Sequence, residues 1–370
     1  MLDANGIIGT LRACAQRINP SGVASLVDAK PPLLMSLPLT KHPALRSGPA
    51  TPLRARARWK EAALAYAFLA PSALILGFFG FAPLVNAFLL SLREWKLSPA
   101  GYVGLRNYQQ ALADEQFWKS VGVTLYYVLG TVPAILVIGY LLAELLHSRI
   151  RGLPFYRTLF FLPYVVSPVA AAAVWQWILR PDVGIASALA RRVGWQTRWL
   201  QEEEGILHLL GNWMHIPVPE WAGGPSLALV CIIMVSIWHS LGFAVVVLLA
   251  GLSAVPSEVI DAARIDGARG WRLMRHVKLP LLSPTLFFLL VVFTIRAFQT
   301  FNWIYILSVD NRGGPAGTTR NITLYIVESF HFNAPRLGPG YGSAVAILLF
   351  LVILVLTLAQ FRFLGRRVHY

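Results

Sequence analysis

Six apolar stretches, each long enough to cross a lipid bilayer, constrain the fold of this chain more than any other feature. A membrane-crossing helix needs about 20 predominantly apolar residues to span about 30 Å of hydrocarbon, at a rise of 1.5 Å per residue. Buried helices of soluble domains are usually shorter. The sequence therefore predicts an all-α membrane protein with six transmembrane helices, at 62–92, 120–143, 158–179, within 226–252, at 279–309 and within 341–361.

The composition agrees with a membrane environment. Hydrophobic residues make up 56% of the chain and charged residues 13%, and that charged share is about half of what a soluble domain carries. A formal net charge of +15 would suggest a nucleic-acid partner in a soluble protein. Here the basic residues flank apolar stretches, as topology signals do, so the lipid bilayer is the predicted partner and nucleic acid is not.

The positions of the Lys and Arg residues predict how the spans are oriented. These residues are enriched in short cytoplasmic loops of membrane proteins. Their distribution predicts that both termini lie in the cytoplasm and that the chain is a multi-pass protein of the cell's inner membrane. The basic segments that would then face the cytoplasm are 54–60, 149–157, 264–278 and 362–367.

The N-terminal part of the chain differs from the rest. Residues 1–55 contain many prolines and have no long apolar run and no secretory signal core. Such a composition predicts a disordered cytoplasmic extension, followed by a six-helix transmembrane domain over 56–370. Met35 is an alternative start of translation.

The loop between the fourth and fifth predicted spans, 253–280, carries the most informative pattern. A Pro-Ser pair signals a helix start, and Glu258 stands in the first turn, where the helix dipole favours an anion. Ala262 and Ala263 are small enough for another surface to approach closely, and Gly267 allows the chain to turn. The pattern predicts an exposed helix–turn–helix suited to docking a soluble partner. On these grounds alone, an ordinary basic loop with interfacial helices remains an alternative.

This loop resembles the EAA loop of ABC-importer permeases, whose pattern is Glu-Ala-Ala, three residues, Gly, nine residues, Ile, one residue and Leu-Pro. Asp261 takes the place of Glu and Val277 that of Ile, and both replacements keep charge and shape. Glu258 and Asp266 complete the expected coupling loop. The residues that match the family spacing are Asp261, Ala262, Ala263, Gly267, Val277, Leu279 and Pro280.

Other stretches are similar to sugar permeases of the maltose-transporter type, and the similarity covers roughly 59–363. The loop at 191–223 is longer than is usual in that family, and Arg296 stands where a neutral residue is expected. Both departures bear on the substrate rather than on the family. The stretches that carry the similarity are 104–108, 117–124, 155–163 and 298–308, the last followed by Gly-Gly-Pro at 313–315.

The resemblance implies the MetI-like fold of a type I ABC-importer permease and a role as one permease subunit in the uptake of a sugar or related polyol. The partners it implies are cytoplasmic ATPase subunits, a second permease subunit in a heterodimer, and an extracytoplasmic solute-binding protein. It further implies that Asp261 faces an arginine of the ATPase and that Gly267 shapes the loop.

No motif for catalysis accompanies these features. The sequence contains no G-x-x-x-x-G-K-[ST], H-E-x-x-H or G-x-S-x-G pattern, so we expect no catalytic residue, no cofactor, no metal site and no ATP hydrolysis by this chain. An ion-driven secondary transporter is the alternative function. Such transporters usually need ionisable residues deep in the membrane, whereas Glu61, Glu144 and Asp310 lie at the ends of predicted spans. An intramembrane enzyme is a third and weaker alternative.

Polar and aromatic residues in the fourth and fifth spans are the candidate substrate contacts. Sugars are bound by amide hydrogen bonds and by stacking on aromatic rings, which favours Gln299, Asn302, Trp238 and Tyr305 as pathway residues. Trp303 and His239 are further candidates of the same kind. The same residues would also serve for hydrogen bonds between helices or as interfacial anchors. Arg296 would suit an anionic substrate such as a sugar phosphate, or would pair with a helix C-terminus.

Overall fold

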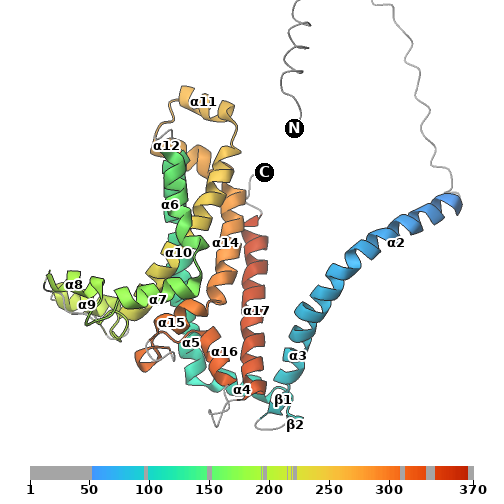
Figure 1. The fold of residues 1–370 in the computed structure, drawn as a ribbon, viewed down its shortest axis with the longest axis horizontal. Helices are drawn as coiled ribbons and strands as arrows, with labels where there is room; N and C mark the ends of the chain where they lie inside the picture. The colour runs from blue at the N-terminus through green and yellow to red at the C-terminus, as the bar shows by residue number, and fades with distance from the viewer. Residues whose placement is uncertain are drawn as a thin grey trace, which may run out of the picture. The chain divides into compact units, whose positions relative to one another are not determined.

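The computed structural model describes residues 52–95, 99–147, 152–192, 194, 198–214, 216–217, 219, 223–308, 313–330 and 338–365. Helices dominate this part of the chain, as Figure 1 shows. The described part contains one two-stranded antiparallel sheet, of β1 Arg93–Trp95 and β2 Pro99–Tyr102. Most of the predicted N-terminal extension lies outside the described residues, and α2 begins at Pro52. The prediction of an all-α membrane protein is confirmed.

Within the described residues, four helical segments are long and apolar enough to cross a membrane unaided. The first, Glu61–Ser91, runs through α2 (Pro52–Ile75), a π-helical turn at Leu76–Phe81 and α3 (Ala82–Ser91). The described residues before Ser72 form a unit of their own. The other three segments are α5 Glu115–His147, α10 Leu227–Ser253 and α17 Pro339–Phe363.

The third predicted span is not one straight helix. It consists of α6 Leu153–Val165 and α7 Pro168–Ile178, which meet at 95°. Val166 and Ser167 between them are extended, with ψ of 139° and 129°. The break follows from Pro168, because a proline ring disfavours helical geometry in the residue before it.

The fifth predicted span is also bent, and helical pieces precede it in the chain. Short helical pieces covering Trp271–Leu281, namely α12 (Trp271–Leu273), η3 (Met274–Lys278) and α13 (Leu279–Leu281), meet α14 (Ser283–Phe298) at 71°. After a break at Gln299–Phe301 the chain continues as α15 (Asn302–Leu307). If each bent pair is one span, the described chain has the six spans that the sequence predicts.

Helix α5 forms the core together with α10, and α6 and α14 pack against this pair (Figure 1). Small residues line these contacts. A Cβ added to Gly139 of α5 would lie 3.2 Å from the Ala244 side chain of α10, and one added to Gly242 of α10 would lie 2.8 Å from the Phe160 carbonyl oxygen of α6. Lipid offers no hydrophobic drive for helix association, so close van der Waals packing of this kind holds the bundle together.

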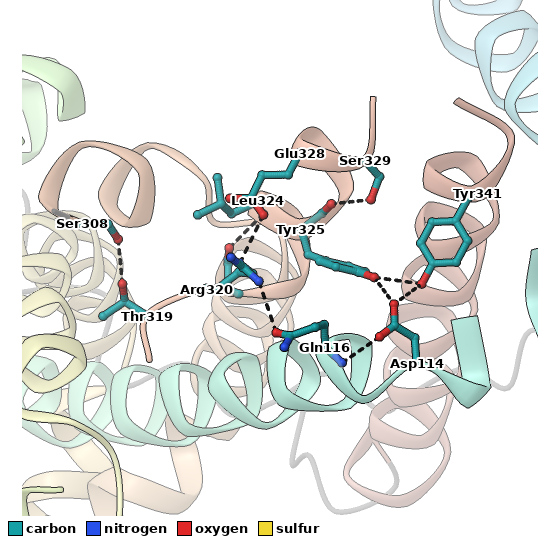
Figure 2. A network of polar contacts seen from close by, with 11 residues as sticks. Asp114, Gln116, Ser308, Thr319, Arg320, Leu324, Tyr325, Glu328, Ser329 and Tyr341 are labelled. Atoms are coloured by element: carbon teal, nitrogen blue, oxygen red, sulfur yellow. Dashed lines mark hydrogen bonds and ion pairs between the residues drawn. The ribbon is translucent and has the colours of Figure 1, made fainter. Parts of the chain in front are cut away.

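A polar cluster joins α5 to α16 (Ile322–Ser329) and α17 at one end of the bundle. Figure 2 shows the Asp114 carboxylate between α4 (Arg106–Ala113) and α5, accepting hydrogen bonds on Oδ2 from the hydroxyls of Tyr325 at 2.6 Å and Tyr341 at 3.0 Å. Its Oδ1 accepts from the Gln116 N–H at 2.9 Å. Burial raises the pKa of the Asp114 carboxyl, but the hydrogen bonds offset this and hold its pKa below the usual value.

Arg320 extends the same cluster. Its Nη1 donates to Gln116 Oε1 at 3.2 Å, and its Nε lies 3.2 Å from Glu328 Oε2, so one guanidinium links the start of α5 to α16 (Figure 2). Residues far apart in sequence therefore fasten this end of the bundle with charge-assisted bonds, which are stronger than neutral ones.

We expect the Asp114→Asn variant to be less stable than wild type by about 1–2 kcal/mol, because charge-assisted bonds are lost from a partly exposed carboxylate. The Asp114 pKa is lower in the folded state than in the unfolded state, so its contribution is present above the unfolded value of about 3.9 and is lost as the pH falls through the folded value. The Tm values of the two proteins in detergent should differ at pH 7, and the difference should shrink as the pH falls below the unfolded pKa.

The matched control for this prediction is Asp182→Asn, which removes an exposed carboxylate outside the cluster. Its Tm should follow wild type at every pH. Equal Tm values for the two variants at pH 7 would show that the cluster contributes nothing to stability.

Candidate functional site

The loop between α10 and α14 has the helix–turn–helix shape that the sequence predicts. Helix α11, Ser257–Ile265, follows Pro256 and carries Glu258 in its first turn. Gly267 then turns the chain with φ of +85°, a conformation that side-chain-bearing residues rarely adopt. The second helical arm is the Trp271–Leu281 piece that leads into the bend before α14.

The first arm of this loop presents an exposed surface. The Asp261 side chain is 65% exposed and pairs within its own helix with Arg264, at 3.1 Å. Ala262 is exposed beside it, Ala263 is half-buried, and Glu258 and Asp266 are exposed. Two large apolar side chains of the loop are also exposed: Ile265 at the end of the first arm is 87% exposed, and Trp271 at the start of the second arm is 60% exposed. Exposed apolar groups rimmed by charge are typical of a surface that binds another protein.

The second arm is anchored to α5. The Lys278 ammonium pairs with the Glu144 carboxylate, and both side chains are largely buried, at 10% and 17% exposure. One helical turn away on α5, the Tyr140 hydroxyl donates to the Met274 carbonyl at 3.1 Å. The sequence placed Lys278 among solvated basic residues and Glu144 simply at a span end. The only signal for a pair was that each charge stands between apolar neighbours in the sequence.

A groove of about 640 Å³ separates the exposed arm from the anchored one. Its lining carries charges of both signs together with apolar side chains, a mixture that suits binding to the surface of another protein. Val277, Leu279 and Pro280 lie beyond it, half-buried on the way to the bend. The residues that line the groove are Glu144, His147, Ser257, Ile260, Asp261, Arg264, Gly270, Leu273, Met274 and Lys278.

A second candidate site is a cavity of about 170 Å³ among the spans, lined by residues of α5, α6, α7, α10, α14 and α15. Hydroxyl groups form part of its wall: the Tyr127 hydroxyl lies 2.6 Å from Ser236 Oγ and 3.4 Å from Thr300 Oγ1. The cavity adjoins the break between α6 and α7 and the break between α14 and α15. Its lining residues are Tyr127, Thr131, Ile135, Tyr164, Pro168, Ser236, His239, Ser240, Phe293, Arg296, Ala297, Thr300 and Trp303.

Aromatic rings and one cation complete this cavity. Arg296 donates from Nη1 to the Tyr164 hydroxyl at 3.2 Å, and its guanidinium carbon lies 5.3 Å from the centroid of the Phe243 ring. The rings of His239 and Trp303 meet edge to face at 5.0 Å. The site can therefore offer hydroxyl donors, ring faces and a positive charge.

Of the predicted pathway residues, Trp303 and His239 line this cavity, whereas Gln299, Asn302, Trp238 and Tyr305 lie outside its lining. Gln299 and Asn302 are exposed at the break between α14 and α15. Tyr305 stacks on Phe301 with centroids 5.1 Å apart, and Trp238 meets Trp175 edge to face. The cavity residues that sequence reasoning missed, such as Tyr127, come from helices whose neighbours the sequence does not specify.

Comparison with known proteins agrees with this architecture. Residues 116–370 match the family described as binding-protein-dependent transport system inner membrane component. The chain is 32% identical over 296 residues to a probable ABC transporter permease protein of Pyrococcus horikoshii, covering 79% of this chain and 92% of the relative. It is also 32% identical over 310 residues to the sn-glycerol-3-phosphate transport system permease protein UgpA of Agrobacterium fabrum, covering 83% and 96%.

A third relative, the trehalose/maltose transport system permease protein MalF of Thermococcus litoralis, is 31% identical over 313 residues, covering 84% and 96%. Among solved structures, a bacterial alginate ABC transporter in complex with its alginate pentasaccharide-bound periplasmic protein contains a similar chain. That chain has a TM-score of 0.66 at 22% identity, with 81% and 93% covered. The resemblance read from the sequence is therefore confirmed, and this chain belongs to the binding-protein-dependent inner-membrane components, the permeases of ABC importers.

Proposed function

We propose that this permease carries a sugar or related polyol across the membrane and that a separate ATPase drives it by docking on the loop between α10 and α14. The observation that carries the coupling role is the exposed Asp261 beside two alanines, next to a groove and joined through an anchored arm to α5. A carboxylate on a close-approach surface suits a bidentate bond from a partner arginine. The names of the relatives, for trehalose/maltose and for glycerol phosphate, support the substrate class.

The proposed partners are two ATPase subunits, a second permease subunit and an extracytoplasmic solute-binding protein. Helix α17 leaves room for a neighbouring subunit, because only 17% of its most apolar stretch is buried. Such a surface faces lipid or another membrane subunit. The similar alginate transporter was solved with a periplasmic binding protein, which supports delivery by a partner of that kind. In this proposal the chain itself catalyses no reaction.

The proposal places the α10–α14 loop in the cytoplasm and the α7–α10 connection outside. A cysteine introduced at Glu203 should react with a membrane-impermeant thiol reagent added to intact cells, whereas one at Arg269 should react only after the cells are opened. Both positions are exposed in the folded chain, so burial would not mask either. The reverse labelling pattern would contradict the orientation.

We expect Asp261→Lys to lose the ATPase while staying in the membrane. The change sets like charges against the expected arginine, and breaking such an interface pair costs about 2–5 kcal/mol. Its own pair with Arg264 is exposed and is worth only about 0.3–0.5 kcal/mol. Gly267→Trp should act similarly, because its positive φ strains any side chain although the space around it is open. Co-purification of the ATPase subunit measures both effects.

Asp261→Glu is the conservative control and should retain ATPase binding and substrate-stimulated ATP hydrolysis in reconstituted membranes. The same reconstitution tests the alternative of an ion-driven transporter, since transport would then continue without ATP. Wild-type binding and transport by both Asp261→Lys and Gly267→Trp would remove the loop as the coupling site.

We expect Lys278→Met to destabilise the protein by about 3–5 kcal/mol, because it leaves the Glu144 carboxylate buried without its cation. The double variant Glu144→Gln/Lys278→Met should recover much of the Tm, since no buried charge remains. Lys119→Met is the matched control: its pair with Glu115 is exposed and is worth at most about 1 kcal/mol. A double variant as unstable as Lys278→Met would show that packing, and not the charge, is responsible.

A further inference from the structure

We propose that the cavity beside Arg296 binds an anionic group of the transported molecule, so that the substrate is an acidic sugar or a phosphorylated polyol and not a neutral sugar. This inference rests on the proposed transport function and specifies the substrate class. The shared chemistry is a set of negatively charged oxygens, from either a carboxylate or a phosphate. The first observation is the position of Arg296 itself, in the last turn of an otherwise apolar membrane helix.

A cation at this position needs a reason to be kept. Charged side chains within membrane spans are costly, and those that occur usually face a cavity or a pathway. Arg296 is exposed at the surface of this subunit and also lines the cavity. Among the described residues no carboxylate forms an ion pair with it, and its hydrogen bond goes to the Tyr164 hydroxyl at 3.2 Å. Most of its five N–H donors therefore remain for a ligand.

The surroundings hold the guanidinium in place without neutralising it. The Phe243 ring lies 5.3 Å from the guanidinium carbon, and the Tyr164 ring stacks on Phe243 with centroids 5.3 Å apart. A ring face attracts a cation and restricts its orientation, but it leaves the edge of the guanidinium open. A guanidinium edge presents parallel N–H groups that match the oxygens of a carboxylate or phosphate.

Hydroxyl groups on the cavity wall supply further donors for such oxygens. Tyr127, Ser236 and Thr300 are joined by hydrogen bonds in which either partner could donate. Ser240 is a further polar residue of the lining. An anionic group can neutralise the guanidinium and accept hydrogen bonds from the hydroxyls. A neutral sugar would leave the guanidinium without a counter-charge.

The size of the cavity limits what part of the substrate enters it. Its volume of about 170 Å³ is below the roughly 300–1,000 Å³ of pockets that enclose drug-sized ligands. It therefore accommodates a head group, and the rest of the substrate lies outside it. Gln299 and Asn302 are exposed at the adjacent helix break and flank Thr300 of the lining in the sequence.

The test uses the complete importer, purified with its second permease subunit and ATPase in lipid nanodiscs. Binding of radiolabelled D-glucuronate, sn-glycerol 3-phosphate and D-glucose is measured for wild type, Arg296→Gln and Arg296→Lys. We expect wild type to bind at least one charged probe in preference to glucose. Arg296→Gln should weaken that binding at least about tenfold, because charged hydrogen bonds are lost, and Arg296→Lys should retain part of it. Preference between the two charged probes identifies carboxylate or phosphate.

Two controls keep the outcomes distinct. Tyr164→Phe removes the hydroxyl that positions Arg296 and should weaken binding of the charged probe less than Arg296→Gln does. Recovery of the ATPase with the permease is measured for wild type and for every variant. Absence of the ATPase even from wild type would refute the proposed function. Normal ATPase recovery together with equal probe binding by wild type and Arg296→Gln would refute only the anion-binding cavity. Loss of the second permease subunit from Arg296→Gln would overturn the inference too, because Arg296 would then be pairing with that subunit.

Discussion

Inside a bilayer every backbone N–H and C=O must find its partner within the protein, and this constraint explains both the long helices and the places where they break. The carbonyl of Val166, between α6 and α7, receives a hydrogen bond from His239 Nε2 at 3.1 Å. At the break between α14 and α15, the carbonyl of Thr300 receives a hydrogen bond from Asn321 Nδ2 at 2.6 Å. Near the same break, Thr323 Oγ1 donates to the Phe298 carbonyl at 3.1 Å. Polar side chains from neighbouring elements thus replace the missing helical bonds.

The breaks in turn create the cavity. A continuous helix shows only side chains to its surroundings, whereas a broken one also brings backbone and loop residues to the middle of the bundle. The cavity lies where the α6–α7 break and the α14–α15 break adjoin α5 and α10. Asn321 is fully buried and supports the cavity without lining it. Its side chain caps α16 by accepting from the Leu324 N–H and donates to the Thr300 carbonyl. The polar chemistry available for a substrate is therefore a product of irregular backbone that the surrounding helices keep satisfied.

Sequence reasoning reached the parts of this structure that depend on local chemistry. Apolar length predicted the spans, and the positive φ of Gly267 is what a turn at a glycine predicts. The break before Pro168 was not predicted, and the carbonyl exposed there is satisfied by His239, which lies 73 residues beyond Val166. The pair of Glu144 with Lys278 joins residues 134 apart, and no periodicity reports such a contact. Arg296 was visible because a charge interrupts an apolar run, while Tyr127 and Ser236 became recognisable only once two helices were brought together.

The close contact of α10 with its neighbours has a consequence for how the gene can vary. At Gly242 an added Cβ would lie 2.8 Å from a backbone oxygen of α6, and at Gly139 an added Cβ would lie 3.2 Å from a side chain of α10. Replacing glycine by alanine is among the smallest changes that mutation makes, yet at Gly242 the added methyl group would press on backbone, which cannot rotate away. The positions least tolerant of variation should therefore include residues without any functional group, and their intolerance would reflect the distance between two helix axes and not the chemistry of transport.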